Sequence, residues 1–467
     1  MNEMSDDRSQ SGDAFSRLPE ELIHHILSFL TLKDAAALAA VSKQWRLRWR
    51  TCRNLDLDVD FIRRHRKAVY DRAAAVRYVD WVNRILQSHE GERIDSFRVR
   101  SWLSEHNGNQ IDQWIQFAVT KKAARLELDP DPLPGRYNAG DGLGGYMVPD
   151  WFWSVEAPFL EHLTLRNVKL GSAGFGGFKH LTSLCLAGSA VSQAFVQDIM
   201  CNCSQLRLLD IKNCIKSSGL KIEIPHQHPL IHLNVLQWGD SFIQIDIEGA
   251  QNLESLKCVF GAIEVPMLRK IQKLKKLHFM SSRVMPALEY VIGELGQDAP
   301  HLEYFHLTMY GNWLIPTCES VKMTSLSRLR HMSLSATSSQ HLTDFVIAVL
   351  RICPVLQTLD LSPGYGYNTS SDAIVRRTFK ENFSHVTLET INIYGFQFSQ
   401  TGVDSVVYLL EHSVNLKKIQ IWQRDQRGNE DGKFYLSKFS NMRQPAPAII
   451  EKWFHEHVTF KASLVVL

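Results

Sequence analysis

Leu206-Arg-Leu-Leu-Asp-Ile211 and Leu356-Gln-Thr-Leu-Asp-Leu361 share one spacing, with apolar residues at positions i, i+3 and i+5. Eleven such triplets follow one another, and their first residues lie about 26 residues apart on average, within the roughly 20–29 residues typical of leucine-rich repeats. Because side chains alternate along a β-strand, residues i+3 and i+5 point to the same side. The sequence therefore predicts an α/β solenoid in which each repeat adds one parallel strand with a buried apolar side.

The segments between the triplets predict the other side of this solenoid. Residues 191–200, 288–295, 342–350 and 403–410 carry apolar residues every three to four positions, as helices with one buried side do. Strands and helices in alternation predict a horseshoe with a concave parallel sheet and a convex side of helices and extended segments. Residues 242–247 alternate with period two instead and are expected to form a strand on the convex side.

Composition also suggests the boundaries of the domains. The repeat array is expected to cover residues 91–440, preceded by a helical linker at 56–90 and, at 1–13, by a disordered tail. Within the array, residues 129–150 hold four Pro and five Gly and predict a long loop, which is disordered, a simple insertion or a ligand contact. Residues 441–467 combine a helical apolar face with a final strand and are expected to cap the last repeat.

Residues 14–55 predict three short helices. Pro19 suits the first turn of a helix, and the residues after it form an apolar stripe, namely Leu22, Ile23, Ile26, Leu27 and Leu30. Thr31 followed by Asp34 matches a capping pattern for a second helix, and Ser42 can cap a third. Helices this short bury too little surface to be stable alone. We therefore expect the stripe to pack on the next domain or on a partner protein.

Composition argues against several classes of protein. The chain has 467 residues, a net charge of +3 and eight cysteines without a Cys-x-x-Cys pair, which argues against a disulfide scaffold or a cross-braced zinc module. No apolar run is long enough to span a membrane, and the polar start lacks the features of a secretory signal. We therefore expect the protein in the cytoplasm, the nucleus or both.

The sequence also bears on catalysis and cofactor binding. The sequence has no nucleophile elbow and no metal-binding His-Glu-x-x-His, so no catalytic residue, cofactor or metal is expected. Residues 43–67 hold nine Lys or Arg against three Asp. No aromatic-lined groove accompanies this basic stretch, so a solvated helix face is favoured over a nuclear-import signal or a nucleic-acid contact.

The most specific motif lies between residues 14 and 50. It runs through Leu18-Pro-Glu-Glu-Leu22, Ile26-Leu-Ser-Phe-Leu30, Lys33-Asp34 and Val41-Ser-Lys-Gln-Trp-Arg46, in order and in register, and it resembles an F-box. One departure is the run Ala35-Ala36-Ala37, where many F-boxes have a larger apolar residue or an Arg.

The rest of the chain is similar to plant F-box proteins with leucine-rich repeats, including the subgroup with a C-terminal FBD region. Val148-Pro-Asp-Trp-Phe-Trp153 resembles the start of the first strong repeat of that subgroup. Residues 388–440 resemble its FBD stretch.

This resemblance implies a non-catalytic substrate-recognition subunit of a Skp1–cullin–F-box (SCF) type E3 ubiquitin ligase. In such ligases the F-box binds a Skp1-like adaptor, which links it to a cullin and a RING protein, and the repeats hold the protein to be ubiquitinated. The subunit needs no catalytic residue because it supplies proximity and orientation. The residues that would make or support the adaptor contact, some of which could instead form the core of the module, are Leu18, Pro19, Leu22, Ile26, Leu27, Leu30, Val41 and Trp45.

Contacts with the target protein are expected on the solvent side of the strands. Positions i+2, i+4 and i+6 of each triplet point there, and exposed aromatic and histidine side chains suit an interface. The candidates, which could alternatively be solvated polar positions with a few tolerated aromatics, are Lys276, His278, Tyr304, His306, His331, Tyr394 and Trp422. The histidines predict that target binding changes between about pH 6 and pH 7.5.

Two alternative functions remain open from the sequence. One is a receptor for a small, hormone-like molecule on the same ligase, with a pocket built from loops 129–150 and 362–385. The other is a leucine-rich-repeat scaffold without a ligase role. Adaptor binding separates the scaffold from the other two, and ligand-dependent target binding separates the small-molecule receptor from the protein receptor.

Overall fold

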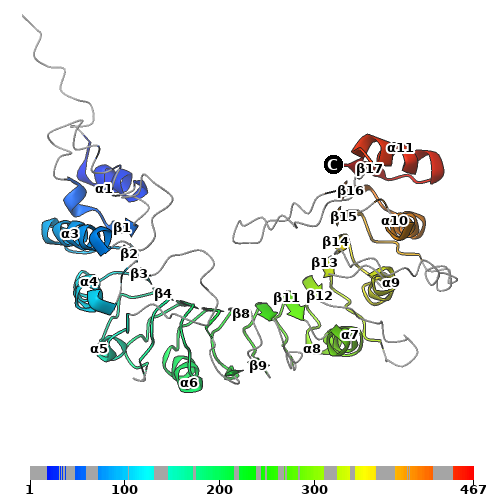
Figure 1. Ribbon diagram of the computed structural model, residues 1–467. Coiled ribbons are helices and arrows are strands. Elements are labelled where there is room, and N and C mark those ends of the chain that lie inside the picture. The colour runs from blue at the N-terminus through cyan, green and yellow to red at the C-terminus, as the bar shows by residue number, and fades with distance from the viewer. Residues whose placement is uncertain are drawn as a thin grey trace, which may run out of the picture. The chain divides into compact units, whose positions relative to one another are not determined.

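The computed structural model describes residues 18–30, 32, 34, 37, 48–58, 72–101, 103, 105–130, 146–171, 175–214, 220–237, 243–247, 250–260, 268, 271–281, 284–309, 323–336, 342–363, 384–396, 398, 400–423 and 445–467. The chain divides into two compact units, residues 1–216 and residues 217–467. Figure 1 labels the helices and strands of both units. Both units consist of short parallel strands joined by helices and loops.

In residues 1–216 consecutive strands pair in the order of the chain. They are β1 (Asn54–Asp58), β2 (Ser96–Arg100), β3 (Arg125–Asp129), β4 (His162–Arg166), β5 (Ser183–Ala187) and β6 (Leu208–Lys212). Leu126 of β3 lies opposite Leu163 of β4, and Leu128 lies opposite Leu165. All four side chains are buried, and burying a leucine stabilises the fold by about 1.5–3 kcal/mol. The apolar side of the strands therefore forms the core of this unit.

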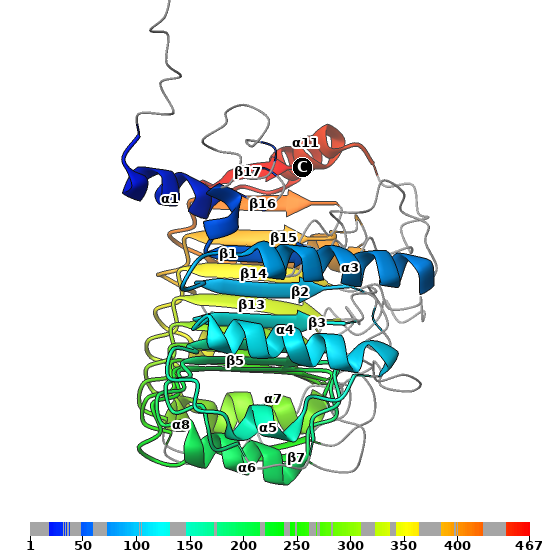
Figure 2. The same cartoon turned by 90° about the vertical axis from the view of Figure 1, so that its left-hand side faces the viewer.

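The helices of this unit follow the strands along the buried side of the sheet (Figure 2). They are α1 (Glu20–Phe29), α3 (Arg72–Ser88), α4 (Gly108–Thr120), α5 (Asp150–Ser154) and α6 (Gln193–Asn202), with the 3-10 turns η2 (Arg48–Thr51) and η4 (Glu105–Asn107). Trp114 of α4 is buried, and its indole N–H donates to Oδ1 of Asn83 in α3 at 2.8 Å. This hydrogen bond satisfies a polar atom that burial would otherwise leave without a partner.

An aromatic cluster packs behind β4 and β5. Phe152 and Trp153 of α5 are fully buried. The Trp153 ring lies 5.2 Å from the rings of both Phe175 and Phe195, and Phe152 lies 5.1 Å from Phe178. Edge-to-face and tilted aromatic pairs of this kind stabilise a core beyond the area they bury. The motif Val148-Pro-Asp-Trp-Phe-Trp153 therefore supplies a structural anchor for this part of the array.

In residues 217–467 the main sheet again runs in chain order. Its strands are β8 (His232–Gln237), β10 (Ser255–Phe260), β11 (Lys276–Ser281), β12 (Tyr304–Met309), β13 (His331–Ala336), β14 (Thr358–Pro363), β15 (Thr390–Tyr394), β16 (Lys418–Trp422) and β17 (Ser463–Val466). One buried side chain from each of six neighbouring strands lies in a continuous row, which comprises Leu277, Phe305, Met332, Leu359, Ile391 and Ile419. This row is the counterpart of the leucine rows in residues 1–216.

Other elements of this unit lie outside the main sheet. They are the strand pair β7 (Leu220–Glu223) and β9 (Ile243–Asp246), and the helices α7 (Val284–Gly293), α8 (Leu295–Asp298), α9 (Leu342–Ile352), α10 (Gln400–His412) and α11 (Pro447–His457). The alternating segment 242–247 thus contains a strand outside the main sheet, as its pattern predicts. The final helix and strand are also present, with Ile450 and Phe454 of α11 buried and β17 paired to β16.

The backbone turns in the same way after several strands. The residue that directly follows β4, β5, β6 and β15 has a positive φ, with values of 54° at Asn167, 63° at Gly188, 52° at Asn213 and 71° at Gly395. Glycine has no steric penalty in this left-handed region, and asparagine tolerates it better than most residues. The N–H of Asn167 donates to the carbonyl of Ala187 in the next strand at 2.7 Å. The turn thus extends the hydrogen-bond ladder between repeats.

These observations confirm the predicted α/β leucine-rich-repeat solenoid with parallel strands. In each triplet the i+3 and i+5 residues are buried, as Leu209 and Ile211 show with exposures of 0% and 1%. The strand β1, at residues 54–58, already pairs with β2, so parallel strands begin before residue 91. Most of the expected loop at 129–150, and most of the second and third helices expected before residue 50, lie outside the described residues.

Candidate functional site

Helix α1 carries the first candidate surface. It begins after Pro19, and its two sides differ sharply in exposure. Ile23 and Leu27 are 1% and 2% exposed, whereas Leu22 and Phe29 are 47% and 75% exposed. Leu22 and Phe29 are seven positions apart, which is about two helical turns, so they lie on the same side of the helix. This side presents apolar surface to solvent.

The residues predicted to contact an adaptor differ in their solvent exposure. Pro19 and Leu22 are exposed, and the residues that are half-buried are Leu18, Ile26 and Leu30. Leu27 is buried within the chain itself, so it supports the helix from behind. Val41 and Trp45 lie outside the described residues.

Phe29 is a surface residue that the sequence prediction missed. Its ring meets the ring of His25 edge-on at 4.8 Å between centroids, and both side chains are exposed. The signal was present in the sequence, because Phe29 follows Leu22 and Ile26 at seven and three positions, the spacing of one helical side. Phe29 therefore extends the exposed side of the apolar stripe by one further turn, which widens the candidate surface.

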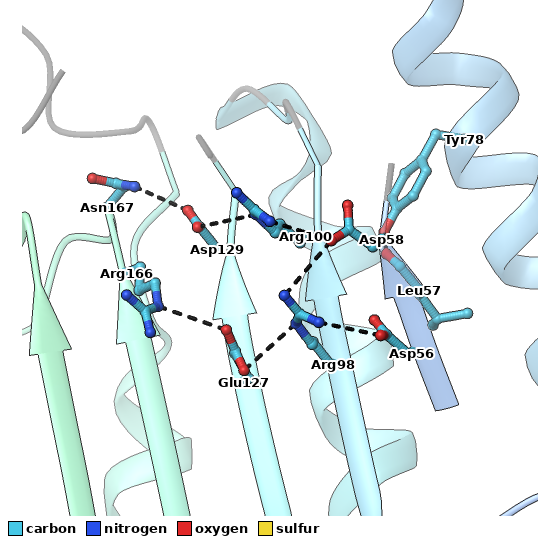
Figure 3. Close-up of polar contacts among 10 residues, drawn as sticks. All are labelled: Asp56, Leu57, Asp58, Tyr78, Arg98, Arg100, Glu127, Asp129, Arg166 and Asn167. Atoms are coloured by element: carbon cyan, nitrogen blue, oxygen red, sulfur yellow. Dashed lines mark hydrogen bonds and ion pairs between the residues drawn. The ribbon is translucent and has the colours of Figure 1, made fainter. Parts of the chain in front are cut away.

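The second surface is the sheet face opposite the helices in residues 1–216, where charged residues of neighbouring strands alternate in sign. Figure 3 shows the guanidinium of Arg98 on β2 between acidic residues of β1 and β3. Its nitrogens lie 3.1 Å from Asp56 and 3.6 Å from Asp58. On the other side its Nε lies 3.6 Å from Glu127. One arginine thus bridges three strands.

The pattern continues along the next row of residues (Figure 3). Arg100 lies 3.4 Å from Asp58 and 3.8 Å from Asp129, and Arg166 of β4 lies 3.6 Å from Glu127. The side-chain amide of Asn167 donates to Asp129 at 2.9 Å. We call this set the charge ladder: Asp56, Asp58, Arg98, Arg100, Glu127, Asp129, Arg166 and Asn167. Four carboxylates and three guanidinium groups make it nearly neutral.

Burial affects the acids at the β1 end of the ladder. Desolvation raises the pKa of Asp56 above its ordinary value, and Arg98 only partly offsets this effect. The hydroxyl of the fully buried Tyr78 in α3 donates to the carbonyl of Leu57 (Figure 3). This contact anchors β1 from the helix side. The charge ladder therefore pairs most of its charges within the sheet, although Oδ1 of Asp56 is buried without a hydrogen-bond partner. The sequence did not predict it because the pairs join residues about 30 to 40 positions apart.

The third surface is the same sheet face in residues 217–467. The strand register places Lys276, Tyr304 and His331 side by side in one row. The next row brings His278 of β11 opposite His306 of β12. The structure therefore brings together the five predicted target-binding residues of β11, β12 and β13.

The rings of this group are in direct contact. His278 and His306 stack with centroids 4.1 Å apart, and Tyr304 lies 4.8 Å from His331. Nε2 of His331 lies 2.8 Å from Oδ2 of Asp360 on β14. We call Tyr304, His306 and His331, with His278 and Lys276, the ring cluster.

Asp360 holds the ring cluster from the β14 side. The amide of Asn392 donates to its other oxygen, Oδ1, at 2.7 Å. Both oxygens of this carboxylate are therefore engaged by neighbouring side chains, His331 on one side and Asn392 on the other. These bonds orient the His331 ring against Tyr304.

The last two predicted target-binding residues form a separate pair. Tyr394 of β15 and Trp422 of β16 stack with centroids 4.6 Å apart and planes 9° apart. Strand β14 lies between β13 and β15 in the sheet. The seven predicted target-binding residues therefore form two separate groups, the ring cluster and this stacked pair.

Two expectations for this face need correction. Alternation places Met280 and Ser333 on the same face as the ring cluster, but they are only 4% and 2% exposed, because neighbouring side chains cover them. Burial, with a smaller contribution from the charge of Lys257, lowers the pKa of His278 to about 4. His278 therefore stays neutral between about pH 6 and pH 7.5 and cannot supply the charge change expected there.

The described residues offer little for chemistry or for a small ligand. Among them no group of three or more His, Cys, Asp and Glu side chains is placed to hold a metal ion. Within the same residues no helix is both long and apolar enough to cross a membrane. A cavity of about 200 Å³ lies between the end of α4 and the segment before β4, beside Phe159, below the roughly 300–1,000 Å³ of ordinary ligand pockets.

Comparison with known families accounts for most of the chain. Residues 85–462 match the leucine-rich-repeat domain described as At1g61320/AtMIF1, and residues 15–57 match the F-box domain. Similar proteins include the F-box protein At3g60790 of Arabidopsis thaliana, which is 24% identical over 61% of this chain and 57% of its own length.

Two further relatives from Arabidopsis thaliana cover shorter stretches. The F-box/LRR-repeat protein At3g58900 is 30% identical over 25% of this chain and 36% of its own length. The F-box/FBD/LRR-repeat protein At5g22700 is 31% identical over 26% of this chain and 25% of its own length. The matches therefore span well under two thirds of each of these relatives.

Proposed function

The chain belongs to the plant F-box/leucine-rich-repeat proteins, with a repeat domain of the At1g61320/AtMIF1 type, and we propose that it is a non-catalytic substrate-recognition subunit of an SCF-type ubiquitin ligase. In this proposal α1 docks on a Skp1-like adaptor, which brings a cullin and a RING protein. The repeats hold the protein to be ubiquitinated. The observation that carries the proposal is an F-box with an exposed apolar helix side joined to a repeat sheet with an aromatic face.

The adaptor half of the proposal rests on the exposure of α1. Leu22 and Phe29 together present a large apolar surface at 47% and 75% exposure, and apolar side chains gathered on one helix side mark interaction sites. Ile23 and Leu27 hold the helix from its buried side. The exposed residues are therefore available to a partner without unfolding the module.

The proposal that the repeats bind a target protein rests on the ring cluster. Tyrosine is enriched among residues that carry binding energy, because it offers a large rigid surface with a polar end. The hydrogen bonds to Asp360 fix the orientation of His331 under Tyr304 before any partner arrives. A preorganised surface loses less side-chain entropy when it binds.

The adaptor contact is tested with the variant Leu22→Ala/Phe29→Ala in the full chain. Both side chains are exposed, so we expect the chain to stay folded and adaptor co-purification to be lost. The matched control is Val76→Ala, an apolar residue of α3 that is 53% exposed. Normal adaptor binding by the double variant contradicts the proposal and favours a repeat scaffold without a ligase role.

The target contact is tested with the triple variant Tyr304→Ala/His306→Ala/His331→Ala. Under proteasome inhibition, ubiquitinated proteins that co-purify with the natural chain should be lost, while adaptor binding stays normal. The matched control is Thr390→Ala/Lys418→Ala/Gln420→Ala, on the same face of β15 and β16. Retention of the same proteins by the triple variant assigns the target site to another surface, the loop at 129–150 first.

A further inference from the structure

A cavity with mostly apolar walls lies between two repeats of residues 1–216. It has a volume of about 200 Å³ and is enclosed by the end of α4, the start of β3 and the segment before β4. Its apolar lining includes Ala118, Val119, Ala123, Leu126 and Leu160. An apolar cavity of about 150 Å³ already holds a benzene ring. This cavity is therefore large enough for one apolar side chain of a partner, although it is small for an ordinary ligand.

An exposed ring with two cations forms part of the rim of this cavity. Phe159 lines the cavity and is 40% exposed. The ammonium of Lys122 lies 5.2 Å from the centroid of the Phe159 ring, and the guanidinium carbon of Arg93 lies 5.8 Å from it. Contacts of this kind hold a cation in place without neutralising its charge. The segments that precede β2, β3 and β4 thus bring two cations to one aromatic ring.

The ammonium of Lys122 is available to an anion. Within the described part of the chain it has no carboxylate partner. Arg93 approaches the half-exposed carboxylate of Asp95 through Nε, at 3.8 Å. Glu156 also lines the cavity, but it is exposed and forms no ion pair with Lys122. Lys122 is therefore the first donor for a carboxylate at this rim, and Arg93 is the second.

The backbone holds Lys122 in an unusual conformation. Its φ is 56°, in the left-handed region that glycine adopts without a steric penalty. The N–H of Lys122 donates to the carbonyl of Val119, and the N–H of Ala123 donates to the carbonyl of Ala118. These two hydrogen bonds end α4 in a motif that usually has glycine where Lys122 stands. A strained residue of this kind points to a function of its side chain.

We propose that this cavity and its rim bind the C-terminal residue of a partner protein, with an apolar side chain in the cavity and the α-carboxylate on Lys122 and Arg93. Lys122 itself lines the cavity, so a carboxylate that it binds lies directly beside the side chain in the cavity. A single residue supplies both groups when it is the last of its chain. This surface is separate from the ring cluster, and the inference goes beyond the proposed function.

The chemistry of the rim favours a carboxylate. Hydrogen bonds from ammonium or guanidinium groups to a carboxylate are about twice as strong as neutral ones. The face of the Phe159 ring is negative, so it attracts the two cations and directs the carboxylate to their other side. The carbonyls of Ala118 and Val119 at the end of α4 already accept hydrogen bonds. They therefore do not compete with the carboxylate for Lys122.

The experiment measures fluorescence polarisation of labelled peptide pools with the full chain. All pools have one length, a label at the N-terminus and random residues other than Asp and Glu. The first pool ends in leucine with a free carboxylate, the second in leucine amide, and the third in glycine with a free carboxylate. We expect the first pool to bind at least about fivefold more tightly than the second, because the amide lacks the ion pair. It should bind at least about tenfold more tightly than the third, because glycine leaves the cavity empty.

A double variant connects the preference for the carboxylate to the rim. Arg93→Gln/Lys122→Gln should make the affinities of the first and second pools equal, while leucine stays preferred over glycine. The matched control is Lys179→Gln/Arg207→Gln, which removes one exposed Lys and one exposed Arg from the segments before β5 and β6. This control should keep the full preference.

A second variant separates binding from stability. Lys122→Gly removes the ammonium but places at φ 56° a residue that is not strained there. The unfolding midpoint should stay unchanged or rise, because relief of the strain offsets the loss of a cation at the end of a helix. The preference for the free carboxylate should fall. A lower midpoint with an intact preference would show that Lys122 only stabilises the end of α4, and it would overturn the inference.

The inference is also overturned by equal binding of the carboxylate and amide pools, by equal binding of the leucine and glycine pools, or by an equal loss in the control. A fourth pool ends in leucine amide and has an aspartate directly before it. If it binds as tightly as the first pool, the site recognises an internal acidic residue and not a chain end. The adaptor and ring-cluster variants are measured by co-purification, so the proposed function and this inference fail on different measurements.

Discussion

In each unit the strands have a face turned away from the helices, and the two units differ in how polar side chains are arranged on that face. In residues 1–216 neighbouring strands alternate in charge, and Arg98 and Arg100 of β2 each approach acids on both adjacent strands. In residues 217–467 the equivalent positions hold rings in direct contact. The strand geometry is common to both, because side chains on adjacent parallel strands meet in register in either unit.

This difference shows that one backbone pattern can carry either side chains that are paired within the chain or side chains that can contact a partner protein. A ladder of opposite charges makes its best contacts within the chain, so a partner gains little there. Rings that stack on each other keep polar edges and faces for a partner. We therefore assign a structural role to the charge ladder and propose binding for the ring cluster.

The largest expected effect tests what the two units share. Leu209 and Leu359 are both fully buried in equivalent positions, so Leu209→Ala and Leu359→Ala should each destabilise the fold by about 2–5 kcal/mol through the cavity they leave. Urea denaturation of each variant measures this loss. Thr358→Ala, which changes a half-buried neighbour of Leu359, should stay within about 0.5 kcal/mol.

If the two leucine variants differ by more than a factor of about two, the units do not share the same core packing. An unchanged midpoint in either variant would refute the repeat register itself.

The second prediction concerns acidification, which should act through the ring cluster. Folding lowers the pKa of His278 to about 4 from its ordinary value of 6.5, so the unfolded chain takes up a proton at a higher pH than the folded chain does. Stability is therefore lost as pH falls from about 6.5 toward 4. At pH 5 this side chain should cost about 1–2 kcal/mol.

Denaturation midpoints at pH 7.5 and pH 5 for the natural chain and His278→Gln measure that contribution. The variant should lose less stability on acidification, while His89, His162 and His228, whose pKa values burial also lowers, contribute to the remaining slope. An identical pH dependence of the two proteins contradicts this assignment. In the charge ladder the raised pKa of Asp56 acts in the opposite sense, since it favours the folded state at low pH.

The third prediction removes the centre of the charge ladder. Arg98→Ala leaves Asp56, Asp58 and Glu127 close together without their shared cation. We expect a loss of about 1–2 kcal/mol at low salt, the sum of several exposed pairs and the new repulsion. High salt should reduce this loss because it screens the repulsion.

The matched control for this prediction is Arg125→Ala, which removes an exposed arginine from the neighbouring strand β3. It should change stability by less than about 0.5 kcal/mol. A loss in Arg98→Ala that does not depend on salt would show that its aliphatic packing, and not its charge, stabilises the sheet.

The smallest expected effect concerns the stacked pair of β15 and β16. Trp422→Leu keeps an apolar side chain but removes the ring that stacks on Tyr394, which should cost about 0.5–1.5 kcal/mol. Thermal unfolding followed by far-ultraviolet circular dichroism measures it. Co-purification of the ubiquitinated targets should not change, because this pair lies apart from the ring cluster; a loss of the targets would extend the binding surface to it.

The core could be predicted from sequence because it depends on local spacing. The i+3 and i+5 rule identifies Leu209 and Leu359 without knowledge of any partner strand. The same rule predicts which residues share the opposite face. It does not predict exposure, as buried Met280 shows, because exposure depends on how neighbouring side chains cover one another.

The charge ladder and the adaptor surface needed the structure for different reasons. Arg98 pairs with Asp56 only because repeats of unequal length bring these strands into register. Phe29 was visible as part of a helical pattern, but its 75% exposure follows from which side of α1 the rest of the chain covers. Both depend on contacts between segments that are distant along the chain.

The residue with left-handed backbone conformation after each of four strands has a consequence for how the repeat array can evolve. Asn167, Gly188, Asn213 and Gly395 end their strands at the same point of the repeat, so the strand is finished before the variable segment begins. An insertion or deletion in that segment leaves the next strand free to start in the old register. Repeats can therefore lengthen, shorten or be duplicated while the faces of the sheet persist, which lets new recognition surfaces diversify on a constant frame.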